Sequence, residues 1–204
     1  MLKLKSAAFD VIKKPYSTSD YSDEQKLLDL LICAEDPLYF LKKYMRIQHA
    51  LKGAIPFLPY SYQERIIIAF HEHRNNILMT GRQLGKTTCA AGYLLWRAMF
   101  VADSTILITA NKYVQALEIM DRVRYAYENM PDYIRAGVTE YNKGTIAFDN
   151  GSKIVSRATS TDAGRGLSIS LLYCLAGETT VKVRDKETGE IQEVTLEQLY
   201  GLLD

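Results

Sequence analysis

The sequence of 204 residues predicts an α/β fold whose core is a mostly parallel β-sheet with flanking helices. Short apolar runs of strand length, such as "STILITAN" at 104–111, alternate with segments whose apolar residues recur at helical spacing. The helical segments, of which 112–130 is one, have the length expected of connections between parallel strands. We therefore expect helices to pack against the sheet and to join its strands.

The part of the chain before residue 75 is predicted to be mainly helical. Aspartate followed by proline is typical of a helix start, because proline is tolerated in the first helical turn. Residues 1–20 are polar and irregular. The predicted elements that follow are a helix from Ser22-Asp23, a helix from Asp36-Pro37 with helical spacing as far as His49, a loop over 53–59 with two prolines, and a helix over 62–74.

The rest of the chain alternates between strands and helices. Asn150-Gly151 indicates a hairpin turn, because such turns need a residue with positive φ. The predicted elements are a short strand in "NNILM" (75–79), a glycine-bearing loop, a long helix to about Phe100, a buried strand over 104–111, a helix over 112–130, a hairpin over 145–156 and a buried strand over 169–173.

Composition is ordinary for a soluble globular protein, with 48% hydrophobic and 24% charged residues. No apolar run is long enough to span a bilayer and no signal peptide is evident, so we expect no membrane partner. Three cysteines, an odd number without metal-binding spacing, favour a reducing cytoplasm. A special thiol would therefore be free to act as a nucleophile.

Charge is distributed unevenly along the chain. Residues 174–204 contain three basic and seven acidic residues and carry a net charge of −4. Because the whole chain has a net charge of +1, residues 1–173 carry +5. The sign changes at residue 174, which predicts a boundary there. A net charge of +5 permits contact with nucleic acid but does not show it.

A phosphate-binding loop is predicted between the strand in 75–79 and the long helix. Thr80 to Thr87 approximates the Walker A pattern G-x-x-x-x-G-K-[ST], with Thr80 in place of the first glycine and Gly81 one position late. Backbone N–H groups would surround the phosphates of ATP, Lys86 would reach the β and γ phosphates, and the Thr87 hydroxyl would bind Mg²⁺. The candidate nucleotide-binding residues are Thr80, Gly81, Arg82, Gln83, Leu84, Gly85, Lys86, Thr87 and Thr88.

The loop "GRQLGKTT" resembles that of the large terminase subunits of tailed phages, the ATPases that pump DNA into capsids. "PYSYQ", "EDPLYFLKKYMRI" and "TANKYVQALEIMDRV" are also similar to this family, over about residues 33–173. The resemblance implies a P-loop NTPase-like fold, with Gln63 reading adenine and Arg82 stabilising the transition state. From the residues alone, Gln63 could instead be an exposed helix-start residue, and Arg82 could simply pair with an acid on the outer side of the loop.

The strand over 169–173 lacks the acidic pair that such an ATPase needs. The Asp of this pair holds Mg²⁺, and a following Glu commonly polarises the attacking water. This chain continues instead with "CLAGETTVKV", which resembles the opening block of an intein, a self-removing protein insert. The resemblance implies that the Cys174 thiol attacks the Tyr173 carbonyl to form a thioester, and that Thr179 helps to hold the bond to be cleaved.

The insert resembles only the beginning of an intein. Residues 174–204 contain no histidine and no asparagine, which an intein needs to complete splicing. They predict a hairpin with strands over 180–184 and 191–194, then a short helix capped by Thr195, and too few apolar residues for a stable core. This resembles the N-terminal fragment of a split intein, which would fold by pairing with a complementary chain.

We therefore expect an N-terminal region with helices and the adenine motif over 1–60, a partial ATPase domain over 61–173 and a split-intein fragment over 174–204. The expected partners are a chain carrying the other halves of intein and terminase and, after joining, double-stranded DNA, the small terminase subunit and the portal, in the cytoplasm of the infected host. Two alternatives stay open: a small stand-alone P-loop ATP-binding or DNA-binding protein with Glu178 as its acid, and part of a terminase with a continuous intein.

Overall fold

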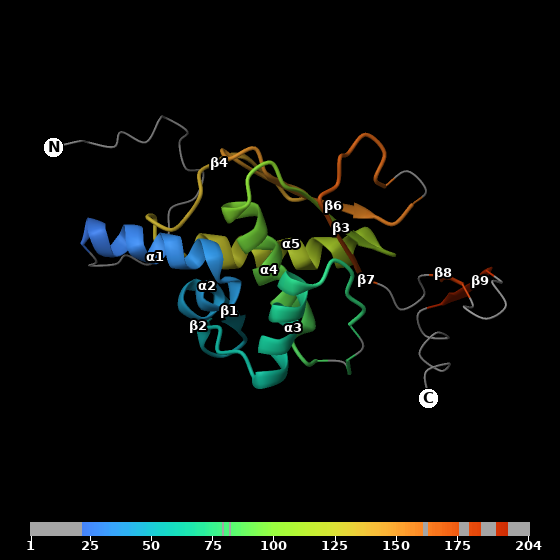
Figure 1. Cartoon of the computed structure of the whole chain (residues 1–204), viewed down its shortest axis with the longest axis horizontal. Coiled ribbons are helices and arrows are strands. Elements are labelled where there is room, and N and C mark those ends of the chain that lie inside the picture. Colours follow the sequence, from blue (N-terminus) through green and yellow to red (C-terminus); the bar gives the residue numbers. More distant parts are fainter. Residues whose placement is uncertain are drawn as a thin grey trace.

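The computed structural model describes residues 22–78, 80–81, 83–160, 163–175, 180–184 and 191–195. Its main body is a five-stranded sheet with helices packed against it (Figure 1). Of the helices in this described part, none is both long and apolar enough to cross a membrane.

The first two helices begin where the sequence predicts. In α1 (Asp23–Glu35) the Ser22 side chain accepts a hydrogen bond from the Gln25 N–H, and the Gln25 side chain accepts one from the Ser22 N–H. This reciprocal capping box satisfies N–H groups that a helix start leaves without partners. In α2 (Pro37–Tyr44) the Asp36 carboxylate accepts from the N–H groups of Leu38 and Tyr39.

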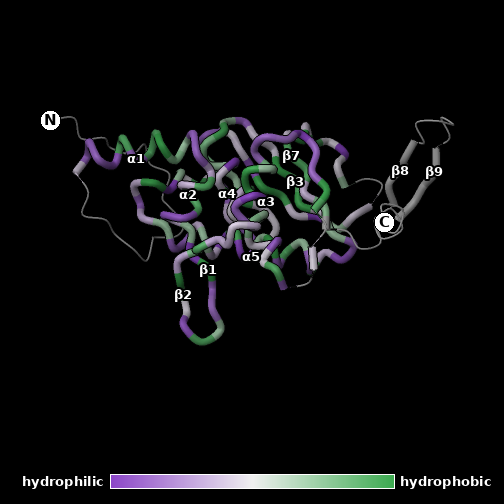
Figure 2. The backbone as a smooth tube through the Cα atoms, turned by 60° about the horizontal axis from the view of Figure 1, so that its bottom comes forward, coloured by the Kyte–Doolittle hydropathy of each residue, from purple (hydrophilic) through white to green (hydrophobic). Residues whose placement is uncertain are grey.

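A β-hairpin follows α2, which corrects two predictions. Helical spacing was predicted to reach His49, but the helix ends at Tyr44 and Arg46–His49 forms β1. The predicted loop over 53–59 begins instead with β2 (Gly53–Pro56), which pairs antiparallel with β1. Gly53 adopts a φ of +67° at the turn, a conformation that glycine reaches easily, and strand pairing then satisfies the backbone groups. Figure 2 shows this hairpin extending from the body.

Three further helices confirm the predicted positions. They are α3 (Ser61–Glu72), α4 (Lys86–Phe100) and α5 (Tyr113–Glu128). Most of α4 is buried, and the Trp96 indole N–H donates to the Cys33 carbonyl at 2.7 Å. This bond ties α4 to α1 within the core.

The main sheet is mixed, which corrects the prediction of a mostly parallel one. Its strand order is β4 (Val138–Tyr141), β5 (Thr145–Phe148), β6 (Lys153–Ala158), β3 (Thr105–Ala110) and β7 (Leu171–Leu175). β3 is parallel to β6 and β7, whereas β4, β5 and β6 pair antiparallel. The predicted turn at Asn150-Gly151 is confirmed, with a φ of +83° at Gly151, and a tight turn of this kind makes its two strands antiparallel. β4 was not predicted from the sequence.

The predicted strand in 75–79 is wrong for its described residues, since 75–78 form no strand. Ile77 is 65% exposed, and Leu78 is only partly buried against the core. A strand requires a neighbour for its backbone groups, and none of the described strands pairs with this segment.

The strand at 169–173 was predicted to be buried, but β7 lies at the edge of the sheet. Tyr173 is partly buried against the core, whereas Leu172 is 58% exposed. A strand at the edge of a sheet has no neighbouring strand on one side, so its side chains are less buried than those of a central strand. A run of apolar residues does not show whether the strand is central or at the edge.

The hairpin predicted after Cys174 is confirmed in its backbone. β8 (Thr180–Arg184) and β9 (Ile191–Thr195) pair antiparallel as a separate two-stranded sheet. The short helix predicted beyond Thr195 lies outside the described residues.

Candidate functional site

The glycine loop ends in a left-handed turn that starts α4. Gly85 is the N-cap residue with a φ of +72°, and Gln83 also has a positive φ of 63°. The first N–H groups of α4, from Lys86 onward, have no partners within the helix. Together with the positive end of the helix dipole, they form a typical binding site for an anion such as phosphate.

The Gln63 side chain forms hydrogen bonds that hold this loop against the start of α3. Its Oε1 accepts from the Tyr60 N–H at 3.0 Å, and its Nε2 donates to the Leu84 carbonyl at 3.1 Å. A Cβ atom at position 85 would lie 2.5 Å from Nε2, so a larger residue there would displace the Gln63 amide, in addition to the strain of the positive φ. The side chain is only 6% exposed, so the alternative of an exposed helix-start residue is wrong. The prediction that Gln63 reads adenine stays a prediction.

A second loop contact was not predicted from the sequence. The Tyr62 hydroxyl donates to the same Leu84 carbonyl at 3.1 Å, and the Tyr60 and Tyr62 rings stack with centroids 5.8 Å apart. The only sequence signal was the pair of tyrosines in "PYSYQ" just before α3. The start of α3 therefore holds the phosphate loop through two side chains.

The Lys86 ammonium folds back over the loop. Its Nζ donates to the carbonyls of Gly81 and Thr80 at 3.2 and 3.4 Å. The Thr80 hydroxyl oxygen is buried and has no hydrogen-bond partner. A buried polar group without a partner is costly, and phosphate oxygens would satisfy both groups. These residues therefore fit a nucleotide phosphate, with the Thr87 hydroxyl as the candidate Mg²⁺ ligand; Arg82 lies outside the described residues.

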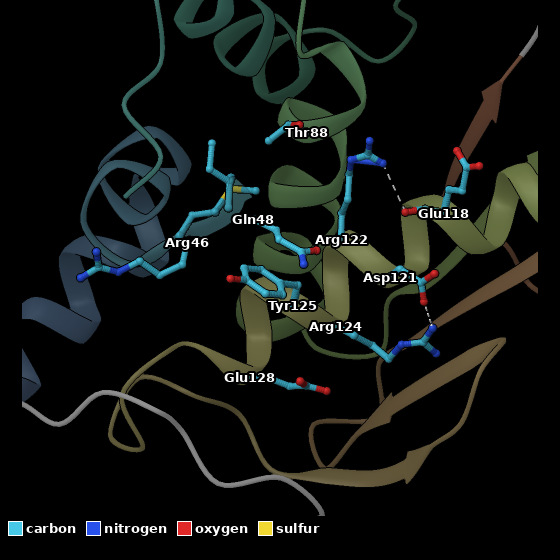
Figure 3. Close-up of a pocket in the computed structure, with 11 residues that line it drawn as sticks. Arg46, Gln48, Thr88, Glu118, Asp121, Arg122, Arg124, Tyr125 and Glu128 are labelled. Carbon is cyan, nitrogen blue, oxygen red and sulfur yellow. Dashed lines mark hydrogen bonds and ion pairs between the residues drawn. The ribbon is translucent and has the colours of Figure 1, made fainter. Parts of the chain in front are cut away.

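The Thr88 side chain, although close in sequence to the phosphate loop, faces a separate hollow. It lines a hollow of about 640 Å³ between β1, α4 and α5 (Figure 3). Arg124 forms an ion pair with Asp121 there, and Arg122 donates to the Glu118 carbonyl at 3.5 Å. The lining carries both signs of charge, so the hollow does not favour an anion by charge alone.

The carboxyl end of β7 carries a thiol where an ATPase of this type needs carboxylates. Cys174 pairs in register with Thr109 of β3, and Leu175 follows it. No group of three or more potential metal ligands is present among the residues that the structure describes.

The three cysteines differ in accessibility. Cys33 and Cys89 are fully buried, and burial raises the pKa of each thiol to about 12. Cys174 is exposed, next to Tyr173, whose own pKa is raised to about 12 by burial. Since the thiolate is the nucleophilic form, only Cys174 is placed to react. Thr179, its predicted helper, lies outside the described residues.

We expect one cysteine to dominate alkylation of the folded chain. At pH 8 a thiol with a pKa of about 12 is about 10⁻⁴ ionised, and both such thiols are also shielded from reagent. Iodoacetamide followed by peptide mass spectrometry should therefore label Cys174 first, and Cys174→Ser should remove the fast phase. Equal rates at all three cysteines in folded protein would contradict this assignment, while equal rates in denaturant serve as the control.

Comparison with known proteins places the loop and β7 as far as Cys174 in one matched segment. Residues 77–174 match the family described as "Terminase large subunit, T4likevirus-type, N-terminal". This segment is therefore similar to the N-terminal part of terminase large subunits. The match ends at Cys174, the residue at which the sequence departs from the expected acidic pair.

A solved structure supports the same fold. The chain resembles the crystal structure of the HK97 bacteriophage large terminase, with 19% sequence identity and a TM-score of 0.57. The similarity covers 69% of this chain and 30% of that protein. The chain therefore spans less than a third of the length of this large terminase.

Proposed function

We propose that residues 1–173 are the N-terminal half of a DNA-packaging terminase ATPase. The observation that supports this most directly is the phosphate loop at the start of α4, inside the segment that matches the terminase family. The loop would bind the phosphates of ATP through Lys86 and the helix N–H groups. Mg²⁺, when bound beside the Thr87 hydroxyl, would neutralise phosphate charge.

This half lacks part of the catalytic machinery. ATP hydrolysis needs a carboxylate to hold the metal and another group to orient water. β7 ends in Cys174 and Leu175 and offers neither. We infer that the missing groups come from a second polypeptide, and that the two halves become one chain by protein splicing.

Cys174 would carry out the first step of this splicing. Its sulfur attacks the carbonyl carbon of Tyr173, the bond from that carbon to the Cys174 nitrogen breaks, and the nitrogen takes the thiol proton to become a free amine. The resulting thioester lacks amide resonance, so a nucleophile on the complementary chain can take the Tyr173 acyl group and release the thiol. The exposure of Cys174 and the β8–β9 hairpin that follows it support this role.

The complementary chain would carry the rest of the intein, then the missing acids and the rest of the motor. Its basic groups would complement the net charge of −4 on residues 174–204. The joined enzyme would act on double-stranded DNA with the small terminase subunit and the portal, in the cytoplasm of the infected host.

Mixing the chain with its complementary chain tests this proposal. We expect a joined product in which Tyr173 is bonded to terminase sequence of the partner, together with an excised fragment that begins at Cys174. Peptide mass spectrometry across the junction identifies both. A chain that stays at its original mass in the presence of a bound partner would contradict splicing and favour a stand-alone ATP-binding protein.

A further inference from the structure

β7 leaves one edge of the main sheet open. It pairs with β3 on one side, and no strand in the described part of the chain pairs with its other side. The backbone of a strand directs alternate N–H and C=O groups to each side, so this edge presents unpaired groups. Such an edge is a template for a further strand.

β7 is also exposed on one of its faces, beside this edge. Ile106 and Ile108 of β3 pack into the core with α4 and α5, and Leu171 and Tyr173 of β7 lie on that same face. The alternate residues, including Leu172, point to the opposite face. Parallel strands such as β6, β3 and β7 are normally covered on both faces.

The opposite face carries an apolar strip of three residues. Leu107 of β3 is buried but lies outside the core cluster, Val155 of β6 is half-buried, and Leu172 is 58% exposed. These three residues are adjacent in register across the strands. The strip runs from the buried Leu107 to the exposed Leu172, and an exposed apolar side chain beside an open strand edge is typical of an interaction site.

We propose that this edge and strip bind the terminase part of the complementary chain before the two chains are joined, and that this docking accelerates trans-splicing. The inference rests on the proposed function. A polypeptide joined to Tyr173 continues from the carboxyl end of β7, directly beside the open edge and face. The similar HK97 protein is much longer than this chain, which leaves a large part of a terminase to cover them.

Docking at this site would act in addition to pairing of the intein fragments. When two chains touch at two sites, binding at one site makes binding at the other effectively intramolecular. Each contact therefore raises the affinity of the pair. A terminase segment held at β7 would therefore keep the complementary intein fragment near Cys174. If an unrelated protein replaced that terminase segment, joining would lose the acceleration that docking provides.

Two complementary chains test the proposal. Both carry the rest of the intein; one continues as the remainder of the terminase, and the other continues as thioredoxin. We expect joining to be at least about tenfold faster with the terminase chain, as one well-buried apolar side chain with strand pairing suggests. Leu172→Asp should remove most of this difference, because it places an unpaired charge in the contact.

Matched variants separate docking from chemistry. Leu172 lies two residues before Cys174, so Leu172→Asp is also measured with the thioredoxin chain, where its rate should be unchanged. Val155→Asp, far from the junction in sequence, should slow only the terminase reaction. Leu58→Asp, at a residue that is 75% exposed outside the sheet, should slow neither. Circular dichroism confirms that the variants are folded.

Equal rates with both complementary chains would overturn the docking proposal and leave splicing intact. Failure of joining with both complementary chains would overturn the proposed function, and docking as a step in splicing with it. If Leu172→Asp slowed joining equally with the terminase chain and with the thioredoxin chain, the substitution would be acting on the reaction at Cys174. This result would also count against docking.

Discussion

Cys174→Ala should abolish both the thioester at Tyr173 and the joined product, while the complementary chain should still bind. In the proposed splicing the thiol is the nucleophile of the first step, and an alanine methyl group offers no replacement. Added dithiothreitol should release residues 1–173 from the parent chain in the presence of the partner, because a thioester exchanges with thiols. It should release nothing from Cys174→Ala. Mass spectrometry measures both, and size-exclusion chromatography measures binding.

The other cysteines provide the controls. Cys33→Ala and Cys89→Ala should splice as the parent does, because both thiols are buried, with pKa values raised to about 12. Cys174→Ser retains a weaker nucleophile and should splice slowly. A product with Tyr173 bonded to partner sequence in Cys174→Ala would show that the thioester route is wrong.

The second large effect concerns ATP. The unjoined chain should bind nucleotide through the α4 loop but show no steady hydrolysis, since β7 ends without the carboxylates that hydrolysis requires. Joining should raise the rate by about 10²-fold or more, which is the scale on which one general base acts. Release of inorganic phosphate, measured before and after joining, checks this expectation.

Lys86→Ala should weaken ATP binding by about 10- to 100-fold, because a charged hydrogen bond to phosphate is lost. Lys52→Ala is the matched control, since this lysine is exposed in the turn between β1 and β2. If the unjoined chain hydrolysed ATP steadily and Lys86→Ala removed this activity, the proposal of a split ATPase would be contradicted. Binding that is unaffected by Lys86→Ala would contradict the phosphate site.

The structure also changes how the supporting residues of this site are understood. Gln63 was singled out from its place before the loop, and its burial beneath Leu84 and Gly85 follows from the packing of α3 against α4. The Tyr62 contact with Leu84 could not be predicted, because nothing in the sequence says which tyrosine faces the loop. Hydrogen bonds between elements depend on how those elements pack.

Local chemistry was enough to predict several features from the sequence alone. Ser22 with Gln25, and Asp36 before Pro37, start helices through bonds to N–H groups two or three residues away. Gly151 permits the hairpin turn by its own φ. The loop before Lys86 and the break at Cys174 are likewise evident in short segments of sequence.

Only the tertiary structure decided which segments form strands and which thiols are accessible. Arg46–His49 forms β1 because β2 lies beside it, whereas none of the described strands pairs with residues 75–78, which form no strand. Cys33 and Cys89 are buried and Cys174 is exposed because of what packs around each of them. Strand pairing and burial join residues that are distant in the chain, so their free energies depend on the assembled fold rather than on any single segment.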